Sequence, residues 1–186
     1  ARRKVLRRAE TLQQIIEIQE RAGDLATAHN LYDDAASHYQ DALRVQKITQ
    51  PDYLRIAEQL IRALIFGQNP VNAEPWLNRV LAAHLENPQG ASKAVEVLLE
   101  LSRQLGIALR TPAALPVVQQ AIDIAEASGD SQLAKIAHIR RAHTLVTMGR
   151  IDEGARELRA VGGVSERDNL SVRITYYWRR GISAAV

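Results

Sequence analysis

The chain has 186 residues, of which 46% are hydrophobic and 4% aromatic, and its formal net charge is +3. This apolar content excludes an intrinsically disordered chain, and its dominance by Ala, Leu, Ile and Val suits closely packed helices. The absence of cysteine excludes a disulfide framework, a thiolate metal site and a cysteine nucleophile. No apolar run approaches the roughly 20 residues of a membrane helix, so we expect a cytoplasmic protein without membrane contact.

Helical patterns follow one another along nearly the whole chain, and alternating strand patterns are nearly absent. Pro51, Pro70 and Pro112 stand at helix-starting positions, and Thr111 is expected to cap the helix that Pro112 opens. The predicted helices, in chain order, cover residues 10–29, 32–45, 51–66, 70–85, 91–106, 112–128, 131–148, 151–161 and 165 to the C-terminus. We therefore predict an all-α fold of about nine helices.

A spacing of small and large residues recurs in every second predicted helix. It consists of a small residue, a large residue four positions later and a second small or β-branched residue three positions beyond that. The four instances are Ala35, Tyr39 and Ala42; Ala73, Leu77 and Val80; Ala114, Val118 and Ala121; and Gly154, Leu158 and Val161. A further position, twelve residues before each instance, is occupied by Gly23, Ile61, Ser102 and Ala142. Small residues in this register allow two helices to pack antiparallel at close range.

This pattern resembles the tetratricopeptide repeat, with a period of 38 to 41 residues in place of the usual 34. The resemblance implies a right-handed α–α superhelix of antiparallel helix pairs, in one TPR-like domain covering 1–186. The expected repeats are about 10–50, 51–88, 90–129 and 130–163, with a partial repeat at 165–186. Gly181 stands where a fifth first helix needs a small residue.

The segment from Ala22 to Leu43 is similar to the repeat arms of bacterial signalling ATPases and of LuxR-type or maltose-regulator-like transcription factors. That resemblance implies a non-catalytic protein- or peptide-interaction and regulatory scaffold that binds a protein or peptide partner. The chain begins with Ala1 and not with Met, which predicts a fragment of a larger bacterial signalling or transcription-regulatory protein. The alternative from a different class is a small-molecule inducer-sensing domain of a transcription regulator.

In the tetratricopeptide family, the first helix of each pair lines the concave face, and this implies the ligand-binding residues. On this chain those positions fall on charged, apolar and aromatic side chains: Glu17, Glu20, Asp24, Arg55, Glu58, Arg62, Phe66, Arg103, Ile139, His143 and Trp178. The arginines among them could hold a carboxylate or an acidic peptide through paired hydrogen bonds.

No motif for catalysis, phosphate binding or metal binding occurs in the sequence, so we expect neither an enzyme nor a cofactor. His138 and His143 lie about 140° apart around a helix, which makes them a poor metal-ligand pair. The basic residues at the two ends, such as Arg7 and Arg179, are read as solvated helix faces, so direct nucleic-acid binding is not favoured. An unpaired last helix predicts a homodimer through the C-terminal end.

Overall fold

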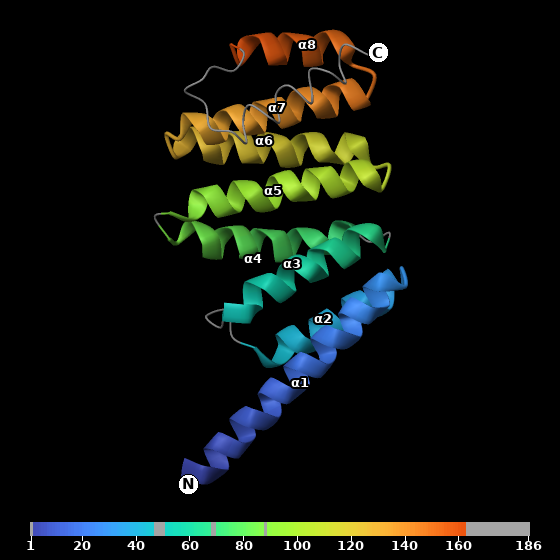
Figure 1. The fold of residues 1–186 in the computed structure, drawn as a ribbon, viewed down its shortest axis with the longest axis vertical. Coiled ribbons are helices and arrows are strands. Elements are labelled where there is room, and N and C mark those ends of the chain that lie inside the picture. The colour runs from blue at the N-terminus through green and yellow to red at the C-terminus, as the bar shows by residue number, and fades with distance from the viewer. Residues whose placement is uncertain (1, 47–50, 68–69, 88, 163–186) are drawn as a thin grey trace. The chain divides into compact units, whose positions relative to one another are not determined.

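The computed structural model describes residues 2–46, 51–67, 70–87 and 89–162, and every regular element within these ranges is a helix (Figure 1). The contacts of the chain cluster into two compact units, Ala1–Ala83 and His84–Val186, which we call unit 1 and unit 2. The single domain over 1–186, its repeat boundaries and its right-handed superhelical path stay predictions.

Unit 1 contains α1 (Arg2–Ala28), α2 (Tyr32–Val45), α3 (Pro51–Phe66), the 3-10 turn η1 (Pro70–Ala73) and most of α4 (Glu74–Leu85). The chain direction reverses from α1 to α2 and again from α2 to α3 (Figure 1). Helix α2 therefore packs antiparallel against both α1 and α3, and η1 packs against α3.

Unit 2 contains α5 (Gly90–Ile107), α6 (Thr111–Ala127), α7 (Ser131–Thr147) and α8 (Ile151–Ala160). Each of these helices packs against the next, and α5 also contacts α7. The connections are three residues long, and each contains one residue with positive φ: Leu109, Gly129 and Gly149. This contact between alternate helices is the arrangement of stacked helix pairs, in which the first helices of neighbouring pairs touch.

The predicted helices agree with the structure at most of their ends, and the bounds of α2 and α3 are as predicted. Helix α1 begins earlier than predicted, at Arg2, because its basic first turns are good helix formers without an apolar period. Residues Pro70–Ala73 form a 3-10 turn before α4, where the sequence predicted a continuous helix. The ninth helix, the partial fifth repeat, Gly181, Trp178 and the C-terminal dimer surface lie outside the described residues.

The predicted cap of α6 is wrong. The residue before the helix is Arg110, which makes no side-chain capping bond, and Thr111 is already helical. A side-chain cap is present on α7, where the Asp130 carboxylate accepts hydrogen bonds from the backbone N–H groups of Gln132 and Leu133 at 2.9 and 3.0 Å. The Thr111 side chain is therefore left to line the surface of unit 2.

The repeated small and large positions form the core of both units. All twelve residues of the four triplets are buried except Val161, which is half-buried, and the four first-helix positions at 23, 61, 102 and 142 are buried as well. Ile61 was the departure from the small-residue pattern, and it is accommodated with only 3% exposure. The sequence spacing therefore identifies the faces along which the helices pack.

Two glycines show why small residues are needed at these positions. A Cβ atom on Gly23 of α1 would lie 2.6 Å from the ring of Tyr39 on α2. A Cβ atom on Gly154 of α8 would lie 2.7 Å from the carbonyl oxygen of Ala142 on α7. Both distances are far inside van der Waals contact, so these helix pairs approach each other at a distance that only glycine allows.

Candidate ligand-binding surface

The residues predicted to bind a ligand in unit 1 are largely bonded to one another. Arg55 of α3 donates to the carboxylate of Glu20 of α1 through both terminal nitrogens, one of these bonds measuring 2.9 Å. The same guanidinium also donates to Asp52 at 3.1 Å. Two carboxylates thus neutralise the Arg55 charge, and the contact ties α1 to α3.

The other predicted positions of unit 1 also have partners within the unit. Asp24 accepts a hydrogen bond of 2.7 Å from the Tyr39 hydroxyl. Burial raises the pKa of Tyr39 to about 12, and the neighbouring Asp24 carboxylate adds to the rise. Phe66 stacks on Tyr32 with 5.2 Å between ring centroids.

The remaining three predicted side chains of unit 1 are Glu17, Glu58 and Arg62. Gln13 donates to Glu17 over 3.4 Å, and Glu58 is half-buried on α3. Arg62 is half-buried too, and its Nε atom is buried without a hydrogen-bond partner among the described residues. Unit 1 therefore brings most of its predicted residues together, but mainly in ion pairs and hydrogen bonds within the unit, which leave less charge available to a ligand.

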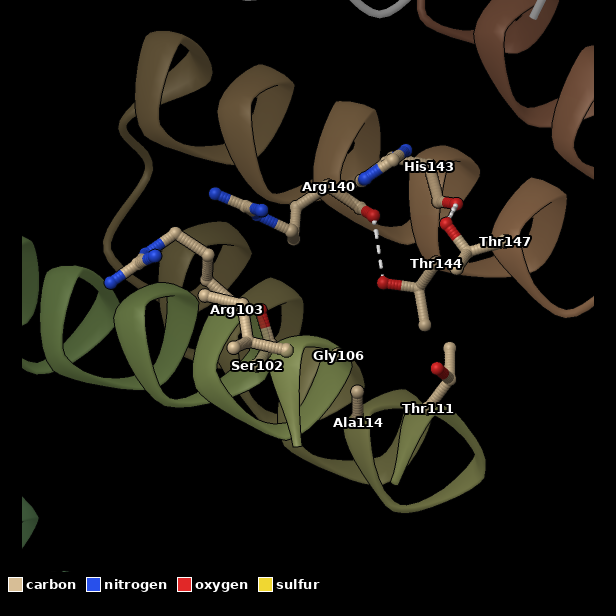
Figure 2. A pocket seen from close by; sticks show the side chains of 10 residues that line it. Ser102, Arg103, Gly106, Thr111, Ala114, Arg140, His143, Thr144 and Thr147 are labelled. Carbon is tan, nitrogen blue, oxygen red and sulfur yellow. Dashed lines mark hydrogen bonds between the residues drawn. The ribbon is translucent and has the colours of Figure 1, made fainter. Parts of the chain in front are cut away.

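Unit 2 contains three of the predicted residues within the described ranges, and two of them, Arg103 and His143, lie on one hollow of about 390 Å³. The hollow lies where α5, the start of α6 and α7 meet, and Figure 2 shows its lining side chains. Its polar and charged lining consists of Ser102, Arg103, Thr111, Arg140, His143, Thr144 and Thr147. Gly106, Ile107 and Ala114 supply apolar surface to it.

Arg140 is the functional candidate that the sequence interpretation missed, and Ile139, its neighbour, was named in its place. Ile139 is fully buried in a cluster with Ala142 and Leu158, so it belongs to the core. The available signal was the position of Arg140 three residues before His143, which places the two side chains on the same face of α7. The prediction therefore assigned the ligand-facing position on α7 to Ile139, one residue before Arg140, which lines the hollow.

The two arginines of the hollow differ in their bonding. Arg103 donates to both carboxylate oxygens of Glu100, at 2.8 and 2.6 Å. The Arg140 guanidinium makes no hydrogen bond or salt bridge with any residue that the structure describes. Burial lowers the pKa of Arg140, while the charge of Glu100 opposes that shift and the charge of Arg103 adds to it. Arginine nevertheless keeps its charge in proteins, so the hollow contains a half-buried cation.

The hydroxyl groups of the hollow are mostly engaged as donors. Ser102 donates to the carbonyl oxygen of Leu99 at 2.7 Å, Thr144 to that of Arg140 at 3.0 Å and Thr147 to that of His143 at 2.9 Å. The oxygens of these hydroxyls keep lone pairs that can accept a further hydrogen bond. The hollow therefore offers a cation and several acceptors.

A second hollow, of about 550 Å³, lies in unit 1 among α2, α3 and α4. Its two arginines already have partners, since Arg44 bonds Asp41 and Arg79 lies 5.2 Å from the centroid of the Trp76 ring. This hollow offers a ligand less unsatisfied charge than the hollow of unit 2.

Within the described part of the chain, the histidines and the long helices were compared with the requirements of metal sites and membrane spans. No group of three or more His, Cys, Asp or Glu side chains there is placed to hold a metal ion. His138 lies between Glu157, at 2.6 Å, and Glu126, at 3.2 Å, and with Arg141 it joins α6, α7 and α8. Among the described helices, none has the length and apolar character needed to span a bilayer.

Comparison with known proteins gives one informative likeness, and it concerns the fold. No protein-family model matches the chain, and no curated protein does. The crystal structure of the apo form of RapI is similar over 98% of this chain with a TM-score of 0.65, at 13% sequence identity. The chain spans about half the length of RapI, covering 53% of it. With the helix order and packing described above, this similarity confirms an all-α, TPR-like helical-repeat fold.

Proposed function

We propose that this chain is a non-catalytic protein- or peptide-binding domain that holds its partner at the hollow between α5 and α7 in unit 2. The observation that carries the proposal is the meeting of Arg103 and His143, predicted from the helix phase of the repeat, with the half-buried Arg140 in one hollow. The larger bacterial signalling or transcription-regulatory protein, and its place in the cytoplasm, belong to the same proposal. RapI was solved as an apo form, the usual term for a binding protein without its ligand, and this supports a binding role.

The hollow is suited to a peptide because its lining combines seven polar or charged side chains with apolar surface along packed helices. Its polar groups are separated by the apolar surface of Gly106, Ile107 and Ala114, a mixture that suits recognition of alternate polar and apolar groups along a chain. No motif for catalysis accompanies these groups.

Selection of peptides from a displayed random library, followed by calorimetry on the purified chain, tests the proposal. We expect selected peptides to bind the wild-type chain and to bind Gly106→Leu at least about tenfold more weakly, because the leucine fills the hollow. Gly106 suits this change because no atom lies within 4 Å of a Cβ atom placed there. Arg159→Gln on α8, an exposed position outside the hollow, is the matched control and should bind as wild type does.

A small-molecule inducer is the second candidate ligand, and the size of the hollow favours it. The volume of about 390 Å³ falls within the range of small-molecule sites, roughly 300 to 1,000 Å³. A screen of small organic acids by thermal shift separates the candidates. Stabilisation by a small acid, with no peptide selected from the library, would replace the peptide proposal by the inducer proposal.

A further inference from the structure

The hollow of unit 1 differs in its chemistry from the hollow of unit 2, and the proposed function does not use it. It is formed mostly by α2 and α4, which the repeat pattern places second in their pairs, and it shares no residue with the predicted ligand positions. Its volume of about 550 Å³ falls within the range of small-molecule sites, roughly 300 to 1,000 Å³. The lining combines two aromatic rings, two amides, two guanidiniums and one aliphatic side chain: Tyr53, Trp76, Gln40, Gln46, Arg44, Arg79 and Leu43. No carboxylate is among these lining residues, so the hollow favours an anion over a cation.

Both arginines of this hollow keep hydrogen-bond donors for an anion. The Arg79 guanidinium lies over the Trp76 ring, 5.2 Å from its centroid, and makes no hydrogen bond or salt bridge with a described residue. A guanidinium that stacks on a ring uses its face, and the N–H groups in its plane stay available for a phosphate. Arg44 bonds Asp41 through one nitrogen, and the two side chains are 73% and 41% exposed, so water competes for this pair. A phosphate in the hollow therefore meets one guanidinium without a counter-ion and one that is weakly held.

The side chain of Gln46 leaves a hydrogen-bond acceptor unused. Its Oε1 atom is buried and has no hydrogen-bond partner among the described residues, which costs free energy in the absence of a ligand. The terminal torsion of a glutamine is soft, so a rotation of the amide can turn this oxygen toward a ligand in the hollow. A glutamine amide carries an acceptor and a donor side by side, and adenine presents the complementary pair, an exocyclic amine beside a ring nitrogen. An adenine-type base therefore satisfies the group that the fold leaves without a partner.

A flat ring is also the group that the aromatic lining suits. The Trp76 indole is half-buried and lines the hollow, and Tyr53, which is 6% exposed, adds a second aromatic side chain. Nucleobases stack on tryptophan rings and on guanidinium planes. An inorganic anion would use only the arginines, and a neutral base would use only the rings and the amides. A base joined to a phosphate uses all of these groups.

We propose that the unit 1 hollow binds a nucleotide, with its base against Trp76 and the Gln46 amide and its phosphate at Arg79 and Arg44. The nucleotide can be free or one unit of a single strand, since both present the same base and phosphate. This site is independent of the peptide site proposed above, because its lining lies within unit 1 and the peptide is assigned to unit 2.

Calorimetry on the full chain tests the site, with tryptophan fluorescence as a second readout that is assigned to Trp76 by its loss in Trp76→Leu. The probes are AMP, purine riboside 5′-monophosphate, adenosine, ribose 5-phosphate and a single-stranded octaadenylate. Purine riboside 5′-monophosphate lacks the exocyclic amine, adenosine lacks the phosphate and ribose 5-phosphate lacks the base. An octaadenylate that binds more than about tenfold tighter than AMP identifies a single strand as the source of the nucleotide, and otherwise the source is a free nucleotide.

We expect AMP to bind with saturation and at least about fivefold tighter than each of the three probes that lack one group. Arg79→Gln and Trp76→Leu should each weaken AMP binding about 5- to 100-fold, through loss of a charged hydrogen bond or of a stacked base. In Gln46→Leu, AMP and purine riboside 5′-monophosphate should bind equally, because the acceptor for the amine is gone. Arg21→Gln, at an exposed arginine of α1 outside the hollow, is the matched control and should change the affinity less than about twofold.

Several results would overturn the nucleotide site. These are the absence of saturable AMP binding, binding of ribose 5-phosphate or adenosine as tight as that of AMP, and unchanged AMP affinity in Arg79→Gln. Circular dichroism checks the fold of each variant, and the exposed position of Arg79 provides a result even where Trp76→Leu unfolds. Octaadenylate binding that is equal in wild type and Arg79→Gln would place the strand elsewhere on the chain and would also overturn the site.

Discussion

Units 1 and 2 use equivalent repeat positions for different purposes. In unit 1, the first helices of the repeat close on each other, since Arg55 bonds Glu20 and Asp52, and Tyr39 bonds Asp24. In unit 2, the corresponding surface leaves a hollow with the Arg140 guanidinium unbonded among the described residues. This difference shows that charged residues at the repeat positions predicted to face a ligand do not by themselves identify a binding site. Their partners within the fold decide whether the charge is available.

The largest expected change in the free energy of unfolding comes from core substitutions, and it should differ between the two units. Tyr39→Ala should lower the free energy of unfolding by about 3–5 kcal/mol, because it opens a large cavity and leaves the Asp24 carboxylate without its donor. Leu158→Ala, the matching position in unit 2, should lose only about 2–3 kcal/mol, since no polar partner is lost there. Urea denaturation measures both. Equal losses would show that the Tyr39 hydrogen bond adds nothing to unit 1.

The Tyr39 phenol should also give unit 1 a stability that depends on pH. Its pKa is raised from 10.0 to about 12, so the stabilisation is fully present below pH 10 and is lost as the pH rises to 12. The loss is on the order of 2 kcal/mol at pH 12, since one pKa unit corresponds to about 1.4 kcal/mol and the phenol in the folded protein is half-titrated at that pH. Tyr39→Phe should lack this loss when the two proteins are compared by urea denaturation at pH 9 and pH 12. Parallel pH dependence of the two proteins would contradict the assignment.

Both units contain a glycine at a close contact between two helices, and replacing either glycine should destabilise the protein. Gly23→Ala and Gly154→Ala should each destabilise by about 1–3 kcal/mol through overpacking. The change at Gly154 should cost more, because its obstacle is a backbone oxygen, whereas at Gly23 a tyrosine ring can shift. Gly106→Ala is the matched control and should stabilise by about 0.5–1 kcal/mol, because it adds helix propensity in open space. Thermal melts would contradict this account if all three changes shifted the Tm in the same direction.

The smallest effect is expected from the exposed charge contacts of unit 1. Arg55→Gln should lower stability by about 1 kcal/mol or less, because the arginine is half exposed and water screens the ion pairs. It should leave binding of the library peptides unchanged, in contrast to Gly106→Leu. Loss of peptide binding in Arg55→Gln would mean that the unit 1 face, and not the hollow of unit 2, receives the peptide.

The sequence predicted the fold well because the helix pattern is local and repeated. Helix breaks at proline and glycine, together with the small positions such as Gly23 and Gly154, determine both the helix bounds and the packing faces. The cap of α6 was placed on Thr111 because a threonine before a proline favours capping, but the helix begins one residue earlier than that pattern implies.

The site was less predictable because it depends on contacts between distant residues. Arg55 and Glu20 are 35 positions apart, and only the packing of α1 and α3 makes them partners. Arg103 and His143 were predicted, but Arg140 was passed over for Ile139. A helix turns by about 100° per residue, so an error of one residue in the assumed phase exchanges a core position for a surface position, and composition cannot correct it.

The central claim is that unit 2, and not unit 1, receives the partner. The most direct measurement is an amide chemical-shift map of the ¹⁵N-labelled chain with a peptide selected from the library. The account predicts that the perturbed signals concentrate on α5, the first turn of α6 and α7, around Arg103, Gly106 and Arg140. Perturbations centred on Glu20, Asp24 and Arg55 of α1 and α3, with the unit 2 signals unchanged, would contradict it.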